Sequence, residues 1–229
     1  MILMERPFIF INSAMSADGK ISTKERKQIK ISGNIDFKRM DQLRAGSDAI
    51  MVGIGTVLAD DPSLTVKSPE LQDKRIKAGL DENPVRIIVD SNARTPIGAD
   101  IFIKGKGKRI IIVSESAPPK KIAELKEKGE IIVAGKDKVD LPEAMQELKE
   151  RGIKQLMVEG GATLNWGMLS NGLVDEIYTF VGNVIIGGKT SPGFIDGAGF
   201  MEKELLKLEL MDSEKIEEGI LLKWKVLQK

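Results

Sequence analysis

The residue types that this chain lacks restrict its chemistry as much as those it contains. Its 229 residues include no cysteine and no histidine. A thiol nucleophile, a Ser–His or Cys–His pair and the usual zinc ligand sets are therefore excluded. Any acid or base in a reaction must be Asp, Glu, Lys, Tyr or water.

The strongest local signal is a glycine turn that follows an apolar run. The run ends in Glu159, and Gly160 and Gly161 lead into a helical pattern that opens with Ala162 and Thr163. Glycines let a phosphate approach the backbone, where the free N–H groups of a helix start can bind it. A plain strand–helix turn that needs glycine for its dihedral angles explains the same residues equally well. The spacing is not G-x-G-x-x-G, so a standard Rossmann site is not implied.

A second glycine-rich segment, residues 53–62, also follows an apolar run. Thr56 offers a hydroxyl, and Asp60 and Asp61 offer carboxylates at the expected ligand-binding rim of a sheet. The alternative is a helix start followed by an acidic turn, with Pro62 as the breaker. Paired aspartates can also indicate a metal, but neither a third clustered acid nor a histidine accompanies them, so we expect no metal.

Three further segments are polar or rich in glycine. Asp18-Gly19 is a turn signal, and Asp90 to Arg94 follows another apolar run. The latter is either a polar turn or a contact for a cofactor ribose or 2′-phosphate, with Arg94 as the anion partner. Residues 182–199 form either a mobile loop over a ligand or a long connection.

Several short β-branched runs must position these segments. They indicate strands buried on both faces of a mostly parallel sheet. The runs are residues 8–11, 49–52, 85–89, 109–113, 130–133 and 155–158. Helical patterns over residues 37–44, 119–128 and 141–151, the last capped by Asp140, lie between them. Strands that alternate with helices favour a doubly wound α/β fold.

The end of the chain has a different pattern. No helical pattern separates residues 176–181, 205–210 and 220–226, which is typical of antiparallel strands added to a sheet.

Residues 67–83 are polar, which predicts a surface loop or a short helix. The length fits a single domain over residues 1–229.

Charge and hydropathy exclude several partners. Lys and Arg total 35 and Asp and Glu total 34, so neither nucleic acid nor an anionic membrane is expected to bind. The N-terminal segment contains Glu5, Arg6 and Pro7, and this composition does not match that of a signal peptide. Because no apolar run is long enough to span a bilayer, we expect a cytoplasmic protein.

Six motifs taken together resemble the reductase family of riboflavin biosynthesis, and in particular its stand-alone archaeal-type members. The family also includes the C-terminal half of the bacterial bifunctional deaminase-reductase. The motifs are residues 15–20 (MSADGK), 43–45 (LRA), 55–66 (GTVLADDPSLTV), 84–91 (PVRIIVDS), 158–164 (VEGGATL) and 172–176 (GLVDE). The string in residues 56–66 is the specific one, since glycine turns alone are common.

The resemblance implies a dihydrofolate-reductase-like fold, NADPH as cofactor with NADH as a second option, and a homodimer. It implies reduction of 2,5-diamino-6-ribosylamino-4(3H)-pyrimidinone 5′-phosphate to its ribitylamino product. The sugar ring opens to an imine, whose C1′ carbon accepts the hydride. The zinc-binding motifs of the attached deaminase are missing, so deamination is not expected.

The resemblance also assigns site residues. Those expected at the cofactor are Met15, Thr56, Asp60, Ser91, Gly160, Gly161, Ala162, Thr163 and Leu164. Those expected at the substrate are Gln28, Arg44, Leu64, Lys67 and Glu159. Asp60 and Glu159 are the candidate catalytic carboxylates, and Arg44 and Lys67 the candidate phosphate ligands. Without the resemblance, both cations would read as solvated surface charges.

Two positions depart from the family pattern. Asn12 stands where bacterial members carry a lysine, and Lys30 where some carry tryptophan or arginine. A catalytic lysine is therefore not expected there. Two other functions remain open, namely another NADPH-dependent reductase on this fold, such as one for a pterin, and a nucleotide-binding domain without catalysis.

Overall fold

The computed structural model describes residues 5–26 and 29–227. The chain divides into two compact units, which we describe separately. Unit 1 comprises residues 5–8 and 41–157, and unit 2 comprises residues 9–26, 29–40 and 158–227.

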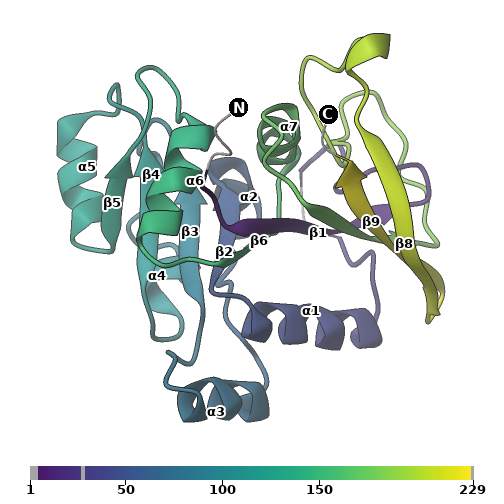
Figure 1. Cartoon of the computed structure of the whole chain (residues 1–229), viewed down its shortest axis with the longest axis horizontal. Helices are drawn as coiled ribbons and strands as arrows, with labels where there is room; N and C mark the ends of the chain where they lie inside the picture. The colour runs from purple at the N-terminus through teal and green to yellow at the C-terminus, as the bar shows by residue number, and fades with distance from the viewer. Residues whose placement is uncertain (1–4, 27–28, 228–229) are drawn as a thin grey trace. The chain divides into compact units, whose positions relative to one another are not determined.

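Unit 1 contains parallel strands with helices between them (Figure 1). Its strands are β2 (Ala49–Gly53), β3 (Val85–Val89), β4 (Arg109–Val113), β5 (Glu130–Val133) and β6 (Gln155–Val158), in the order β5-β4-β3-β2-β6. β3 runs parallel to both β2 and β4, and β4 runs parallel to β5. Ile50, Ile87 and Ile111 are each 0% exposed, because helices cover both faces of such a sheet.

Five helices belong wholly to unit 1. They are α2 (Ile54–Asp60), α3 (Pro69–Lys77), α4 (Asp100–Ile103), α5 (Pro119–Lys126) and α6 (Leu141–Glu150). The Asp140 carboxylate caps α6 by accepting a 3.0 Å hydrogen bond from the Glu143 N–H. Ser68 caps α3 in the same way, at 3.4 Å from the Leu71 nitrogen. The segment 67–83, predicted to be a surface loop or a short helix, therefore contains a short helix over Pro69–Lys77.

Unit 2 is built on a mixed sheet. β1 (Phe8–Ser16) runs parallel to β7 (Glu176–Gly182), and β9 (Gly219–Leu227) is antiparallel to both β7 and β8 (Lys207–Ile216). Its helices are α1 (Asn34–Gly46), whose last turn belongs to unit 1, α7 (Ala162–Ser170) and the 3₁₀ turn Glu202–Glu204. Phe180, Ile216 and Leu221 form a small apolar core, against which Tyr178 packs.

The predicted α/β class is confirmed, with a mostly parallel sheet and antiparallel C-terminal strands. The bounds of β3 to β6 are the predicted ones. The strand expected over residues 205–210 instead spans Lys207–Ile216, because its polar second half pairs with β9 despite having no apolar pattern. α4 was not predicted, since four residues are too few to show a helical period.

The prediction of one domain over residues 1–229 stays a prediction. Among the residues that the structure describes, no helix has both the length and the apolar character needed to cross a membrane.

Candidate active site

In unit 1 the second glycine segment forms a helix directly after a strand. Gly53 is the N-cap of α2, with extended backbone at φ −80° and ψ 154° and no side-chain cap. Thr56 and Asp60 are four positions apart on this helix, so they share one face. Both are half-buried. Burial raises the pKa of the Asp60 carboxyl, which favours its protonated form.

The loop after α2 is held in an unusual backbone conformation. Asp61 has φ 42°, and Leu64 has φ 52° while only 2% exposed. Positive φ is strained for residues other than glycine, so it persists only where surrounding contacts fix it. One such contact is the Asp61 carboxylate, which accepts a 2.8 Å hydrogen bond from the Asp100 N–H.

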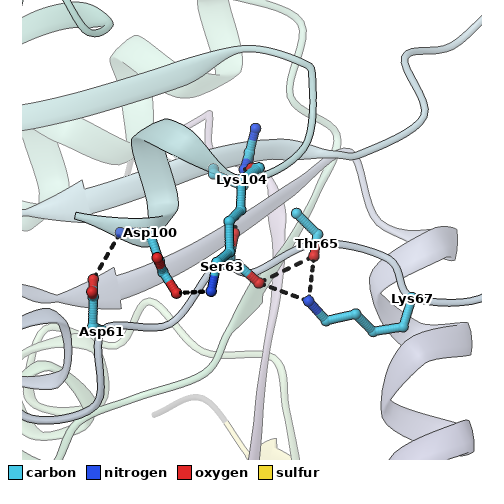
Figure 2. Close-up of polar contacts among 7 residues, drawn as sticks. Asp61, Ser63, Thr65, Lys67, Asp100 and Lys104 are labelled. Atoms are coloured by element: carbon cyan, nitrogen blue, oxygen red, sulfur yellow. Dashed lines mark hydrogen bonds and ion pairs between the residues drawn. The ribbon is translucent and has the colours of Figure 1, made fainter. Parts of the chain in front are cut away.

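Arg44 and Lys67, the candidate phosphate ligands, meet at Thr65. The buried Arg44 donates from Nη1 to the Thr65 carbonyl at 3.1 Å. Lys67 Nζ donates to Ser63 Oγ at 2.8 Å and to Thr65 Oγ1 at 2.7 Å (Figure 2). The buried Asp41 carboxylate fixes the backbone of residues 67 and 68, because it accepts hydrogen bonds from Lys67 N at 2.7 Å and from Ser68 N at 2.8 Å. The structure thus brings three predicted substrate residues, Arg44, Leu64 and Lys67, into one loop cluster.

The charge of Lys67 is disfavoured where it lies. Burial lowers the pKa of its ammonium most, and the positive charges of Arg44 and Lys104 lower it further. Asp41 and Asp100 oppose this effect. An anion placed here would therefore stabilise the ammonium.

Ser91 lies at the carboxyl end of β3. Its hydroxyl accepts a 3.0 Å hydrogen bond from the Val139 N–H, which leaves its own proton available to a ligand. The neighbouring Asp90 is fully buried and accepts from Thr95 N and Thr95 Oγ1, each at 2.7 Å. Arg94 is exposed, with Nε 3.8 Å from Asp90 Oδ1.

In unit 2 the first glycine turn connects β6 to α7. Glu159 is half-buried directly after β6. Gly160 has φ +91°, which only glycine adopts readily, and the Gly160–Gly161 peptide is cis. Gly161 is the N-cap of α7, and no side chain caps the helix. Ala162, Thr163 and Leu164 then form the first turn, as the sequence predicts.

The end of β1 and the turn after it are tied to the long glycine-rich connection. Met15 is half-buried and pairs with Val181 on β7. Asp18 accepts hydrogen bonds from Ser16 Oγ at 2.6 Å, Ile186 N at 3.0 Å and Gly187 N at 2.7 Å. These contacts, with the Ser16 hydroxyl the largest, lower the pKa of Asp18 to about 2. The turn therefore anchors residues 186 and 187 at all physiological pH values.

The two departures from the family pattern have different surroundings. Asn12 is 7% exposed, and its Oδ1 accepts a 2.9 Å hydrogen bond from Arg39, which also pairs with the buried Asp36. Lys30 lies with Nζ 6.0 Å from the centre of the Phe37 ring. Gln28, the remaining predicted substrate residue, lies outside the described residues.

Sequence reasoning missed several polar residues, which fall into two separate groups. In unit 2, Arg39 pairs with Asp36. In unit 1, Asp41, Ser63, Thr65 and Lys104 lie around Lys67. Ser63 and Thr65 lie inside the most specific motif, which was the one available signal. Within residues 5–26 and 29–227, no group of three or more Asp or Glu side chains is placed to hold a metal ion.

The fold is α/β, with an uncapped helix start in unit 2 and a cluster of cations and hydroxyls in unit 1. Groups of both kinds are chemically suited to anions. The chain belongs to the family described as the RibD C-terminal domain, whose model matches residues 7–222.

Two relatives span nearly the same length as this chain. A protein of Archaeoglobus fulgidus named 2,5-diamino-6-ribosylamino-4(3H)-pyrimidinone 5′-phosphate reductase is 48% identical over 198 residues, which cover 86% of this chain and 90% of the relative. A Methanothermobacter thermautotrophicus protein of the same name is 43% identical over 222 residues, covering 96% and 99% of the two chains.

Solved structures agree on the fold. A pyrimidine reductase-like protein of Corynebacterium diphtheriae has a TM-score of 0.82 at 21% identity, covering 97% of this chain and 93% of that one. Dihydrofolate reductase of Enterococcus faecalis has a TM-score of 0.51 at 9% identity, covering 96% and 97%. The predicted dihydrofolate-reductase-like fold is confirmed.

Burial of Asp60 predicts a pH-dependent effect of Asp60→Asn on stability. Because the folded-state pKa is raised, the charged carboxylate destabilises the fold at pH above that pKa. The variant should therefore unfold at the same or a higher temperature than the parent at pH 7. This advantage should vanish below the ordinary pKa of 3.8, where the carboxyl is neutral in both states.

Thermal unfolding at pH 7 and at about pH 3 measures the effect. Asp61→Ala is the contrasting variant, since it removes the carboxylate that accepts the Asp100 N–H, and we expect it to lose stability at pH 7. A lower unfolding temperature for Asp60→Asn at pH 7 alone would contradict the account.

Proposed function

We propose that this chain is an NADPH-dependent reductase of riboflavin biosynthesis. Its substrate is 2,5-diamino-6-ribosylamino-4(3H)-pyrimidinone 5′-phosphate, and it converts the ribosylamino group to a ribitylamino group. The observation that carries the proposal is near full-length similarity, at 48% and 43% identity, to two relatives named for this reaction. The proposal extends to one catalytic domain over residues 1–229, located in the cytoplasm.

The glycine turn of unit 2 fits the diphosphate of a nicotinamide cofactor. Gly160 and Gly161 have no side chains to block an approach, and α7 begins without a side-chain cap. The N–H groups of Ala162, Thr163 and Leu164 would then bind the phosphates. We place Met15 at the nicotinamide and Thr56, Asp60 and Ser91 along the rest of the cofactor.

NADPH is the proposed form of the cofactor, with NADH as the alternative. Support comes from Arg94, whose exposed guanidinium follows β3 three residues after Ser91. A guanidinium is suited to a 2′-phosphate, which NADH lacks.

The reduction needs a hydride at C1′ of the ring-opened imine and a proton at the imine nitrogen. The bound nicotinamide supplies the hydride. The protein must orient the imine, exclude water and manage the proton. Asp60 suits the proton step, because its raised pKa keeps a larger protonated fraction than an ordinary aspartate. We place Glu159 at the substrate amino groups and Arg44 and Lys67 at its phosphate, and we assign Leu64 to the substrate as well.

A homodimer is also proposed, and β8 is the face we assign to it. Nine of the ten β8 residues are exposed, and it is the last strand in the sheet order. Leu208, Leu210 and Met211 on it are 41%, 51% and 50% exposed. A long edge strand with apolar side chains readily pairs with another chain, and a second copy would cover it.

The proposed activity is tested by following NADPH absorbance with the ribosylamino-pyrimidinone phosphate as substrate. We expect turnover with this compound, and Asp60→Asn should lower kcat about a hundredfold or more, since general acid–base groups contribute that much. Asp73→Asn, an exposed aspartate on α3, is the matched control.

Turnover of a pterin alone would favour the other reductase function. Tight NADPH binding without turnover of either compound would favour a nucleotide-binding domain. An unchanged kcat in Asp60→Asn would remove Asp60 from the chemistry.

The cofactor assignment is tested by Gly161→Val. The backbone of Gly161, at φ −70° and ψ −177°, has a conformation that valine can also adopt, and a parent-like circular dichroism spectrum would show that the fold remains. The side chain should occupy the space that the phosphate needs, and NADPH affinity should fall at least about tenfold by calorimetry, the loss of one charged hydrogen bond. Gly46→Ala, whose added Cβ meets nothing within 4 Å, should bind normally. Normal NADPH affinity in Gly161→Val would make the assignment wrong.

The dimer face is tested by sedimentation. Leu208→Glu combined with Leu210→Glu should convert a dimer to a monomer, because the new charges would be buried unpaired. Leu80→Glu, a 49% exposed leucine of unit 1, is the control and should remain dimeric. A dimer that survives the double substitution would place the interface elsewhere.

A further inference from the structure

A polar cluster of unit 2, formed by Asn12, Asp36 and Arg39, has no part in the reaction as proposed above. Arg39 on α1 donates from Nε and Nη2 to one oxygen of the Asp36 carboxylate, Oδ1, at 2.8 and 2.7 Å. The same Nη2 donates to Oδ1 of Asn12 on β1 at 2.9 Å. One guanidinium therefore holds a carboxylate and an amide next to each other.

Each side chain of this cluster has a polar atom without a hydrogen-bond partner. Asn12 and Asp36 are 7% and 5% exposed, and the Arg39 side chain is 16% exposed. Arg39 Nη1 is fully enclosed and bonds to nothing within residues 5–26 and 29–227. In the same part of the chain, neither Asn12 Nδ2 nor Asp36 Oδ2 takes part in a hydrogen bond. Almost all buried polar groups in proteins are bonded, so three unpartnered atoms in one cluster indicate that a ligand binds there.

The bonds of Arg39 decide which atoms a ligand would meet. A guanidinium is only a donor, so it bonds the amide oxygen of Asn12 and leaves the Nδ2 group, with its two N–H donors, for another partner. Asp36 is bonded through Oδ1, so its Oδ2 is left as an acceptor. Because both side chains are tied to the same nitrogen, this donor and this acceptor lie close together.

The charges of the cluster indicate a neutral ligand group. The Arg39 guanidinium and the Asp36 carboxylate form an ion pair, and the carboxylate would repel a phosphate dianion. A neutral group with an N–H beside a C=O is complementary, because its N–H can donate to Asp36 Oδ2. Its carbonyl oxygen has two lone pairs, which can accept from Asn12 Nδ2 and Arg39 Nη1. In a pyrimidinone ring, N3–H and the C4 carbonyl form such a pair, the lactam edge.

We propose that Asn12, Asp36 and Arg39 form a binding site for the lactam edge of a 4(3H)-pyrimidinone ring. The proposal rests on the proposed function, in which this ring is part of the substrate. It concerns N3–H and the C4 carbonyl, whereas Glu159 is assigned to the amino groups of the ring. Three hydrogen bonds to one edge hold the ring in one orientation, which fixes the position of C1′ on the bound substrate.

The site is tested by calorimetry on the full chain with 2,5,6-triamino-4(3H)-pyrimidinone, which carries the ring without the sugar phosphate. Asn12→Asp replaces Nδ2 by an oxygen at nearly constant shape and keeps the oxygen that Arg39 bonds. The C4 carbonyl would then face an acceptor, so affinity for this probe should fall about tenfold or more. Asn34→Asp, at the exposed first residue of α1, makes the same chemical change outside the cluster and should bind normally.

The acceptor is tested by Asp36→Asn. The new amide must also give its oxygen to Arg39, so it presents an NH2 group to the N3–H of the ring, and affinity for the probe should again fall about tenfold or more. NADPH should bind both cluster variants as it binds the parent chain, which a general loss of structure would not allow. If Asp36→Asn does not fold, Asn12→Asp decides the proposal.

The outcomes separate this inference from the proposed function. Probe binding that Asn12→Asp weakens supports the site even if the ribosylamino-pyrimidinone phosphate is not reduced, since a pterin carries the same lactam edge. Reduction of that phosphate with an unchanged KM in Asn12→Asp would overturn the site and leave the proposed function standing. The site is also overturned if the parent chain does not bind the probe, or if NADPH affinity falls equally.

Discussion

The cationic loops of unit 1 depend on buried charges that bond to backbone. Arg86 is the central one, since a single guanidinium accounts for four carbonyls of two loops. Arg75, 6% exposed, acts in the same way on the carbonyl of Ala45, in the last turn of α1, at 2.7 Å and on that of Ser47, just after α1, at 3.0 Å. Asp41 does the reverse, since its buried carboxylate accepts hydrogen bonds from two backbone N–H groups. Such groups are costly to bury without partners, so the loops they hold cannot easily leave their positions.

Unit 2 must also hold its loops in fixed positions, but it uses a glycine turn and neutral or acidic side chains instead of buried cations. Here the phosphate-binding candidate is a glycine turn, and polar side chains hold the connections around it. Asn165 on α7 is fully buried and donates to the Phe194 carbonyl at 2.9 Å, while Asp18 holds Ile186 and Gly187. The glycine turn stays free of side chains, and fixed neighbours define its shape. Preorganised donors of this kind are suited to binding charge without reorganisation.

Much of the fold could be predicted because its strands are continuous apolar runs. β3 to β6 have the predicted bounds, and the glycine turn leads into α7 as expected. What could not be predicted depends on contacts between distant residues. In the sequence, Arg86 is one polar residue within an apolar strand. No nearby residue indicates that it bonds the carbonyls of Ser63 and Lys104. The hydroxyl cluster likewise arises from the positive φ of Leu64, which is unusual for leucine.

In the candidate site too, the sequence predicts some of the residues, and the others are recognised only in the folded structure. The family resemblance located Arg44, Leu64 and Lys67, and the structure brings them together at Thr65. The motifs gave no reason to expect Lys104 or the raised pKa of Asp60, since both depend on what the folded loops bury. Residue types can be read from a sequence, whereas desolvation and through-space charge exist only after folding.

The central claim is that hydride passes to C1′ of the ring-opened sugar. Its most direct test is the reaction of NADPH that carries deuterium at both positions of the nicotinamide C4, with the product analysed by NMR. We predict one deuterium at C1′ of the ribityl chain, in a product whose 5′-phosphate is retained. Deuterium at a pyrimidine carbon, or C1′ hydrogen that derives from solvent, would contradict the account.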